Sequence, residues 1–129
     1  MSSQHRLRKN DGADIAFALS CYYAGAITFA EFQEWLFLVI AQDDDPSPYV
    51  FDMIDVKTRE DFKPFLLMGF VPGDTLSVAQ HRALTGIAIE RGLTEGADGM
   101  SPEAAGAALD AEAAFRARFC AFFPFIVMG

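Results

Sequence analysis

The clearest spacing for chemistry lies in the stretch YYAGAITFAEFQEW, which begins at Tyr22. A calcium-binding EF-hand loop takes oxygen ligands from positions 1, 3 and 5, has Gly at position 6 and ends on a bidentate Glu at position 12. Gly25 and Glu31 fit positions 6 and 12. Positions 1, 3 and 5 are then Ser20, Tyr22 and Ala24, which do not replace three carboxylate-type ligands for a hard cation. The sequence therefore predicts no metal ion here.

The same stretch fits a joint between two helices better. Thr28 and Glu31 match the capping box S/T-x-x-E, in which each side chain bonds a backbone N–H of the first helical turn. Ile27 before the cap and Phe32 after it match a hydrophobic staple. Gly25 suits the left-handed residue that commonly ends a helix. We therefore predict that one helix ends at Gly25 and that the next begins just after Thr28.

The three consecutive acids Asp43, Asp44 and Asp45 suggest a second metal site. Three adjacent side chains do not readily converge on one ion, so a solvated acidic loop is the expected structure. Acids at a helix C-terminus oppose the helix dipole by roughly 0.3–1 kcal/mol each. Asp45 can lead into the next helix, whereas Asp43 and Asp44 have no such local reason and favour a functional role.

Enzymatic chemistry finds little support in the sequence. His5 lies near the chain start and His81 lies in the first turns of a predicted helix, where a lone His is ordinarily a surface or packed residue. Motifs such as H-E-x-x-H and G-x-S-x-G do not occur. Cys21 and Cys120 lie in apolar stretches without a C-x-x-C motif, which favours buried, reduced thiols over a disulfide. We expect no enzyme, no cofactor and no metal.

Composition limits the class of partner. The chain has 129 residues, 52 % of them hydrophobic, and a net charge of −8, so it suits one folded domain and not a disordered one. Nucleic acids and anionic membranes require Lys and Arg, so we expect neither as a partner. The apolar runs fall short of the roughly 20 residues that cross a bilayer. Asp11 and Asp14 also interrupt any secretory signal, and we expect a cytoplasmic protein.

The acids are segregated along the chain. No Lys or Arg occurs between Lys9 and Lys57, and the same interval holds nine acids. Such a single-sign surface captures cationic partners quickly and in a salt-sensitive way. The alternative is that the acids only keep the protein in solution. The nine acids are Asp11, Asp14, Glu31, Glu34, Asp43, Asp44, Asp45, Asp52 and Asp55.

Apolar periodicity and caps predict an all-α fold, a compact single-domain bundle of five or six helices, after a flexible tail over residues 1–10. A short extended segment, FIVM, could end the chain at residues 125–128. A Gly-rich surface loop is expected at residues 93–100. The expected helices cover residues 11–24, 29–42, 48–55, 62–70, 78–91 and 102–123, the third with Ser47 as N-cap and Pro48 in its first position.

Core positions follow from the same spacing. In the first helix, Tyr22 and Tyr23 complete one apolar face. In the third, Phe51 and Ile54 are expected to face the core, with Asp52 and Asp55 on another face. The last helix is expected to bury a mostly aromatic side, formed by Leu109, Phe115, Phe119, Phe122 and Phe123.

The segments YYAGAITFAEFQEWL and DDDPSPYVFDMIDV carry a family resemblance. A short helix ending in aromatics and Gly, an Ile-Thr helix start and an acidic segment resemble small all-helical immunity proteins of bacterial toxin systems. The similar proteins are the colicin D-type immunity proteins and those of contact-dependent growth inhibition. The similarity covers about residues 15–56 and depends mostly on helix-capping residues.

The resemblance implies a cytoplasmic protein of bacterial competition that binds and neutralises a cognate toxin domain, often a basic nuclease. Its acidic surface would mimic the charge of the nucleic acid that it displaces. An acidic helical adaptor or subunit that docks on a basic surface of another complex, and a small-molecule binder or enzyme with a Phe-lined pocket, are the alternatives. The expected contact residues are Glu31, Glu34, Asp43, Asp44, Asp45, Asp52 and Asp55, with Tyr49 either an aromatic anchor or a core residue.

Overall fold

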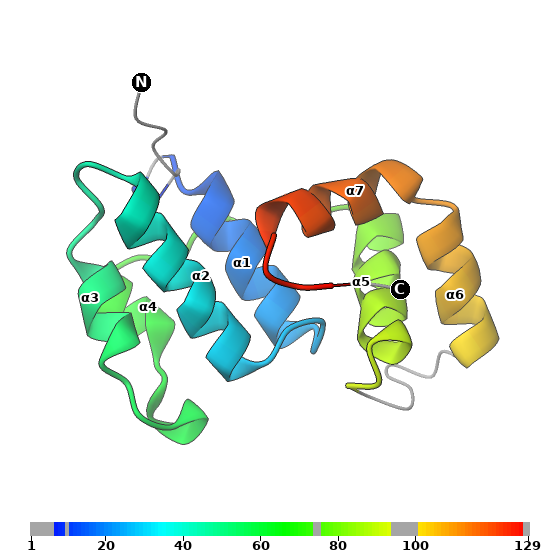
Figure 1. Ribbon diagram of the computed structural model, residues 1–129, viewed down its shortest axis with the longest axis horizontal. Coiled ribbons are helices and arrows are strands. Elements are labelled where there is room, and N and C mark those ends of the chain that lie inside the picture. The colour runs from blue at the N-terminus through cyan, green and yellow to red at the C-terminus, as the bar shows by residue number, and fades with distance from the viewer. Residues whose placement is uncertain (1–6, 10, 74–75, 94–100, 128–129) are drawn as a thin grey trace. The chain divides into compact units, whose positions relative to one another are not determined.

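Helices account for all the regular secondary structure in the computed structural model, which describes residues 7–9, 11–73, 76–93 and 101–127 (Figure 1). These ranges contain no strand, only an isolated bridge between Arg8 and Asp11. The predicted all-α class is confirmed. The helices are α1 (Ala13–Tyr23), α2 (Phe29–Gln42), α3 (Tyr49–Ile54), α4 (Pro64–Met68), α5 (Val78–Glu90), α6 (Pro102–Asp110) and α7 (Ala113–Phe122), with a 3₁₀ turn at Arg59–Asp61.

Backbone contacts divide the chain into two compact units. The first holds residues 1–20 and 29–75, and the second holds residues 21–28 and 76–129. The single-domain organisation expected from the length stays a prediction. Of the predicted tail, residues 1–6 and 10 lie outside the described residues, and Leu7 is buried.

Helix α2 forms the centre of the first unit and has the predicted bounds. Its buried residues are Phe32, Trp35, Leu36 and Val39, at the i, i+3, i+4, i+7 spacing of one helix face. The Phe32 ring lies with its centroid 5.3 Å from that of Phe62 and 6.0 Å from that of Trp35. This aromatic cluster fixes which side of α2 is left for solvent.

Helix α3 begins one residue later than predicted. Pro48 is its N-cap and not its first residue, and no side chain caps it, so the prediction of Ser47 as N-cap was wrong. The Ser47 carbonyl instead accepts a bond from the Val50 N–H at 3.0 Å. Phe51 faces outward and not toward the core as predicted, because the buried residues of this short helix are Tyr49, Val50 and Met53.

The ends of α1 and α4 also differ from expectation. Tyr23 is exposed and does not complete a buried face, because α1 ends at this residue. Gly25 follows with φ of 80°, as predicted for a residue that closes a helix. Helix α4 is shorter than the predicted 62–70 because Gly69, with φ of 79°, ends it after Met68.

The second unit contains the capping box that the sequence predicted at the start of α5. The Ser77 hydroxyl accepts from the Gln80 backbone N–H at 3.1 Å, and the Gln80 side chain accepts from the Ser77 N–H at 3.0 Å. Gly92 follows the helix with φ of 72°, which confirms the predicted end. Of the loop predicted at residues 93–100, residues 94–100 lie outside the described residues.

The predicted last helix is two helices, α6 and α7. Ser101 caps α6 as expected, accepting from the Ala104 N–H at 3.1 Å. The break at Ala111–Glu112 follows from the buried set, since Leu109 and Phe115 are six residues apart and would point about 120° away from each other on one straight helix. After α7, residues 124–127 form a turn and no strand, and Met128 lies outside the described residues.

Candidate functional site

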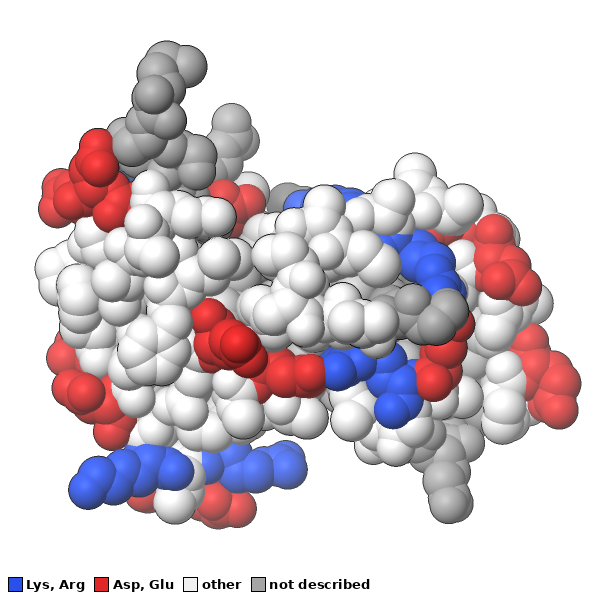
Figure 2. All heavy atoms as spheres, in the orientation of Figure 1, with Lys and Arg blue, Asp and Glu red and all other residues white. Residues whose placement is uncertain are grey.

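All the predicted contact residues lie on the first unit: on α2, on α3, between these helices or, for Asp55, at the C-cap of α3. Glu31 is half-buried. In the part of Figure 2 that shows α2 and α3, the acidic atoms form separate groups with uncharged surface between them. Five of the predicted acids are exposed: Glu34, Asp44, Asp45, Asp52 and Asp55.

These five carboxylates have no hydrogen-bond or ion-pair partner among the described residues. Glu31 and Asp43 differ from these five, because each of them makes an interaction. We use the term acidic surface for Glu34, Asp44, Asp45, Asp52 and Asp55. Because no internal cation neutralises it in the described part of the chain, its charge is available to an incoming molecule.

Asp43 is not a surface residue, which corrects the prediction that it contacts a partner. Its side chain is only 8 % exposed. The Asp43 N–H donates to the Val39 carbonyl at 2.8 Å, so the helical hydrogen-bond pattern of α2 continues for one more residue. Asp43 therefore shares the face of Val39 and Leu36, and both of these side chains are fully buried.

Tyr49 is a core residue and not an aromatic anchor. It is 7 % exposed, and its hydroxyl donates to the Leu7 carbonyl. Its ring also meets that of Phe70 edge-on, with 6.0 Å between the centroids. Burial raises the pKa of the Tyr49 phenol, and a hydrogen bond with Ser47 partly offsets that rise. Of the two alternatives for Tyr49, the structure supports the core.

One side chain of α2 holds α3 in place, and sequence reasoning missed it. The Gln33 amide nitrogen donates to the carbonyls of Val56 at 2.7 Å, Ile54 at 3.3 Å and Met53 at 3.4 Å. The last carbonyls of a helix have no partner within it, so this amide satisfies the C-terminal end of α3. Gln33 thereby positions the helix that carries Asp52 and Asp55.

Two aromatic side chains accompany the acids on this surface. Phe37 of α2 is 58 % exposed and Phe51 of α3 is 47 % exposed. Phe37 belongs to the outer stripe of α2, because it lies three residues after Glu34 and four before exposed Ala41. Positions 32, 35, 36 and 39 are apolar and have the spacing of one buried helix face, and position 37 lies outside that face. The apolar spacing in the sequence therefore already indicated that Phe37 faces outward.

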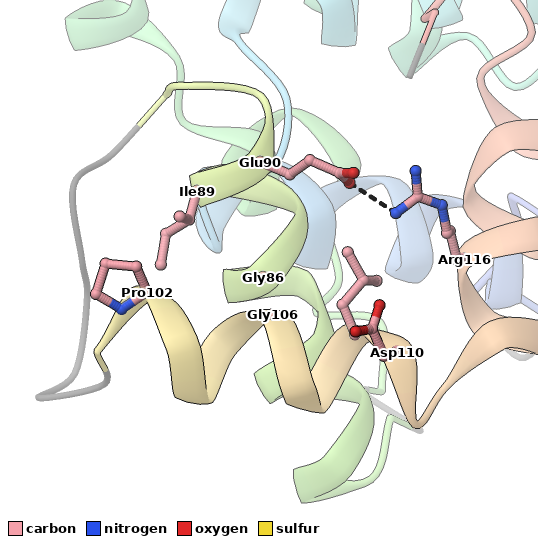
Figure 3. A pocket seen from close by; sticks show the side chains of 8 residues that line it. Gly86, Ile89, Glu90, Pro102, Gly106, Asp110 and Arg116 are labelled. Carbon is pink, nitrogen blue, oxygen red and sulfur yellow. Dashed lines mark hydrogen bonds and ion pairs between the residues drawn. The ribbon is translucent and has the colours of Figure 1, made fainter. Parts of the chain in front are cut away.

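The second unit contains a pocket of about 210 Å³ between α5, α6 and α7 (Figure 3). Arg116 reaches from α7 to Glu90 on α5, with 2.7 Å between guanidinium nitrogen and carboxylate oxygen. The hydrogen bond to Glu90 raises the pKa of Arg116. Asp110 lies on the same side of the pocket, with Ile89 at the other end (Figure 3).

Close helix packing shapes this pocket. A Cβ atom added at Gly86 of α5 would lie 2.4 Å from the Ala105 carbonyl oxygen, whereas one added at Gly106 of α6 would meet no atom within 4 Å. Gly86 therefore permits α6 to approach α5, and Gly106 leaves the hollow open. In this pocket, the Arg116 guanidinium and the Glu90 carboxylate are paired with each other. The Asp110 carboxylate is therefore the main charged group that remains to bind a ligand.

Other candidate groups do not converge. Within the described ranges, no cluster of three or more His, Cys, Asp or Glu side chains could hold a metal ion. His81 is half-buried on α5, and His5 lies outside the described residues. Cys21 and Cys120 are not joined by a disulfide. In the same ranges, every helix is too short or too polar to span a membrane.

No protein-family model, curated protein or solved structure matches the chain. The resemblance to toxin immunity proteins therefore stays a prediction. The acidic surface is the feature of the molecule that bears on its function.

Proposed function

We propose that this chain is an immunity protein, which binds a cognate, cationic toxin domain through its acidic surface and so neutralises it. The observation that carries the proposal is the set of five exposed carboxylates on one unit, none with an internal partner among the described residues. The proposed site is a protein-binding surface and performs no catalysis. We expect the protein to be located in the cytoplasm.

The acidic surface supports fast capture of a basic partner. Electrostatic steering raises association rate constants from a neutral 10⁵–10⁶ M⁻¹s⁻¹ toward 10⁸–10⁹ M⁻¹s⁻¹ at low salt. The Debye length shortens from about 30 Å at 0.01 M salt to about 8 Å at 0.15 M, so the gain falls as salt rises. A basic nuclease domain is a suitable partner because its substrate groove is built to attract negative charge.

Neutralisation follows from competition for that groove. Carboxylates on α3 and on the loop after α2 can take the places of phosphates along the groove, and the bulk of the unit then excludes the nucleic acid. The protein needs no reaction of its own for this role. An adaptor that docks on a basic surface would use the same residues, and only the effect on the partner's activity separates the two functions.

The test uses the protein encoded directly upstream of this gene, which is the position where the proposal places the toxin. Purified chain and toxin domain are mixed, and both binding and toxin activity are measured. We expect a complex with nanomolar-class affinity that weakens as salt rises, and loss of toxin activity at one equivalent of the chain. Binding without loss of activity supports the adaptor, and an absence of binding at low salt contradicts the proposal.

A further inference from the structure

We propose that Phe37 and Phe51 are the anchors of this surface, and that the partner offers an apolar recess flanked by Arg or Lys side chains. This inference rests on the proposed function and adds the residues that keep the complex together. The acids bring the partner in, and the two aromatic rings hold it. The occupant is a cationic protein domain and not a second copy of this chain.

The position of Phe37 follows from its neighbours on α2. Gln33 lies one helical turn earlier on the same face, and its amide bonds carbonyls at the end of α3. Phe37 therefore lies on the side of α2 that borders α3, yet it is 58 % exposed. More than half of the Phe37 surface is therefore open to solvent, which costs hydrophobic free energy until a partner covers it.

Phe51 lies at a similar level on α3. The connection between α2 and α3 is short, and α3 returns alongside α2 in the opposite direction (Figure 1). The Gln33 amide bonds the Ile54 carbonyl, so these two residues lie at the same level. Because the helices run in opposite directions, Phe37, one turn after Gln33, lies at about the level of Phe51, one turn before Ile54. Phe37 and Phe51 thus belong to the same part of the surface, and each has acids within a turn: Glu34 for Phe37, and Asp52 and Asp55 for Phe51.

Charge selects the occupant. Helices α2 and α3 contain no Lys or Arg, so two copies of this face would bring like charges together without compensation. An anionic lipid surface would be repelled for the same reason. An Arg side chain fits both parts of the face, since its guanidinium can lie on a Phe ring within about 6 Å of the centroid while it bonds a neighbouring carboxylate.

The composition matches that of protein interface centres. Aromatic residues are enriched in the buried core of interfaces, and charged residues are found at the rim. A few central side chains provide most of the affinity, and each typically changes Kd by about 30-fold or more on truncation. We expect Phe37→Ala to have that effect, and Phe51→Ala a smaller one of about tenfold, because Phe51 is less exposed.

Kinetics separate anchors from steering charges. Truncation of an anchor loosens the formed complex and raises the dissociation rate constant, whereas a rim charge mainly changes the association rate constant and its salt dependence. The test is surface plasmon resonance of the full chain against the toxin domain encoded upstream. Phe37→Ala and Phe51→Ala are compared with Phe65→Ala and Leu66→Ala, which truncate exposed side chains of α4 outside the face. Circular dichroism checks each fold, and Phe51→Leu replaces Phe51→Ala if the latter does not fold.

We expect dissociation at least tenfold faster for the Phe37 and Phe51 variants, unchanged association, and wild-type behaviour of the α4 variants. If the dissociation rate constant of Phe37→Ala is unchanged and the toxin domain still binds in a salt-dependent way, the proposal that these Phe residues anchor the partner is wrong. The proposed function is then unaffected. If the wild-type chain does not bind, both fail. If sedimentation shows a dimer that Phe37→Ala dissociates, the occupant is a second copy, which also overturns the inference.

Discussion

Gln33 is the side chain whose removal tests the positioning of α3 most sharply. Its amide nitrogen carries two N–H donors and lies within 3.4 Å of three carbonyl oxygens, the nearest being that of Val56 at 2.7 Å. Two donors make at most two full hydrogen bonds, so the third contact is shared. At about 0.5–1.5 kcal/mol for each bond, the Gln33 amide stabilises this end of α3 by about 1–3 kcal/mol.

The variant Gln33→Met removes the donors and keeps most of the side-chain volume. We expect the amides of α3 to exchange with solvent about five- to 140-fold faster, since 1.4 kcal/mol corresponds to a tenfold change in an opening equilibrium. Helix α5 lies in the other unit and serves as an internal reference. Gln42→Met is the matched control, because the Gln42 side chain is exposed at the end of the same helix and makes no hydrogen bond with another described residue.

Hydrogen exchange followed by mass spectrometry or NMR measures the effect. The reasoning is refuted if Gln33→Met leaves α3 exchange unchanged, or if Gln42→Met accelerates it equally. Because α3 carries Phe51, Asp52 and Asp55, the same variant should also slow association with the toxin domain. Its dissociation should be faster as well.

Three further predictions concern packing and burial. Gly86→Ala should destabilise the second unit by about 1–3 kcal/mol through overpacking, and Gly106→Ala should stabilise it by about 0.5–1 kcal/mol; thermal unfolding of both variants checks the contrast. Burial raises the pKa of the Cys21 thiol, so iodoacetamide at pH 8 should label half-buried Cys120 in the native protein and reach Cys21 only after unfolding; equal labelling contradicts this. Tyr49→Phe leaves a buried carbonyl without its donor and should cost about 1–2 kcal/mol, and an unchanged melting temperature would disprove that bond's contribution.

Local sequence signals predicted the parts of the fold that depend on neighbouring residues. The bounds of α2 followed from apolar spacing and its start signal, and the Ser77–Gln80 capping box at α5 is a three-residue pattern. The start of α6 at Ser101 was found for the same reason. In each case the hydrogen bonds that decide the boundary join residues close in the chain.

The rest depended on contacts between distant residues. The division of the last helix comes from packing against other elements, which a helix-favouring Ala-rich segment does not reveal. The bonds from Gln33 reach more than 20 residues along the chain. Asp43 was assigned to a solvated loop because three acids in a row suggest one, whereas the turn of α2 carries this residue round to the buried face.

The aromatic side chains were misassigned for a related reason. Tyr49 and Phe51 are two residues apart on a six-residue helix and so lie about 200° apart around its axis, and fewer than two turns give too few apolar positions to show which of the two sides is buried. The apolar spacing placed Phe51 in the core together with Ile54, whereas the residues that α3 buries are Tyr49, Val50 and Met53. Short helices are thus the elements whose faces the sequence predicts least well.

The measurement that tests the central claim most directly is the salt dependence of association with the proposed toxin partner, the protein encoded directly upstream. The variant is Asp44→Lys with Asp45→Lys, because both side chains are exposed in the loop after α2. The control is Glu60→Lys with Glu103→Lys, which changes the net charge equally from exposed positions outside the acidic surface.

We predict that the wild-type association rate constant falls steeply between 0.01 M and 0.15 M salt. The loop variant should associate about tenfold more slowly at low salt and with a flatter salt dependence, and the control should keep most of the wild-type rate. If the loop variant and the control behave alike, the acidic surface does not guide binding. If the loop variant matches the wild type, the account of this surface is wrong.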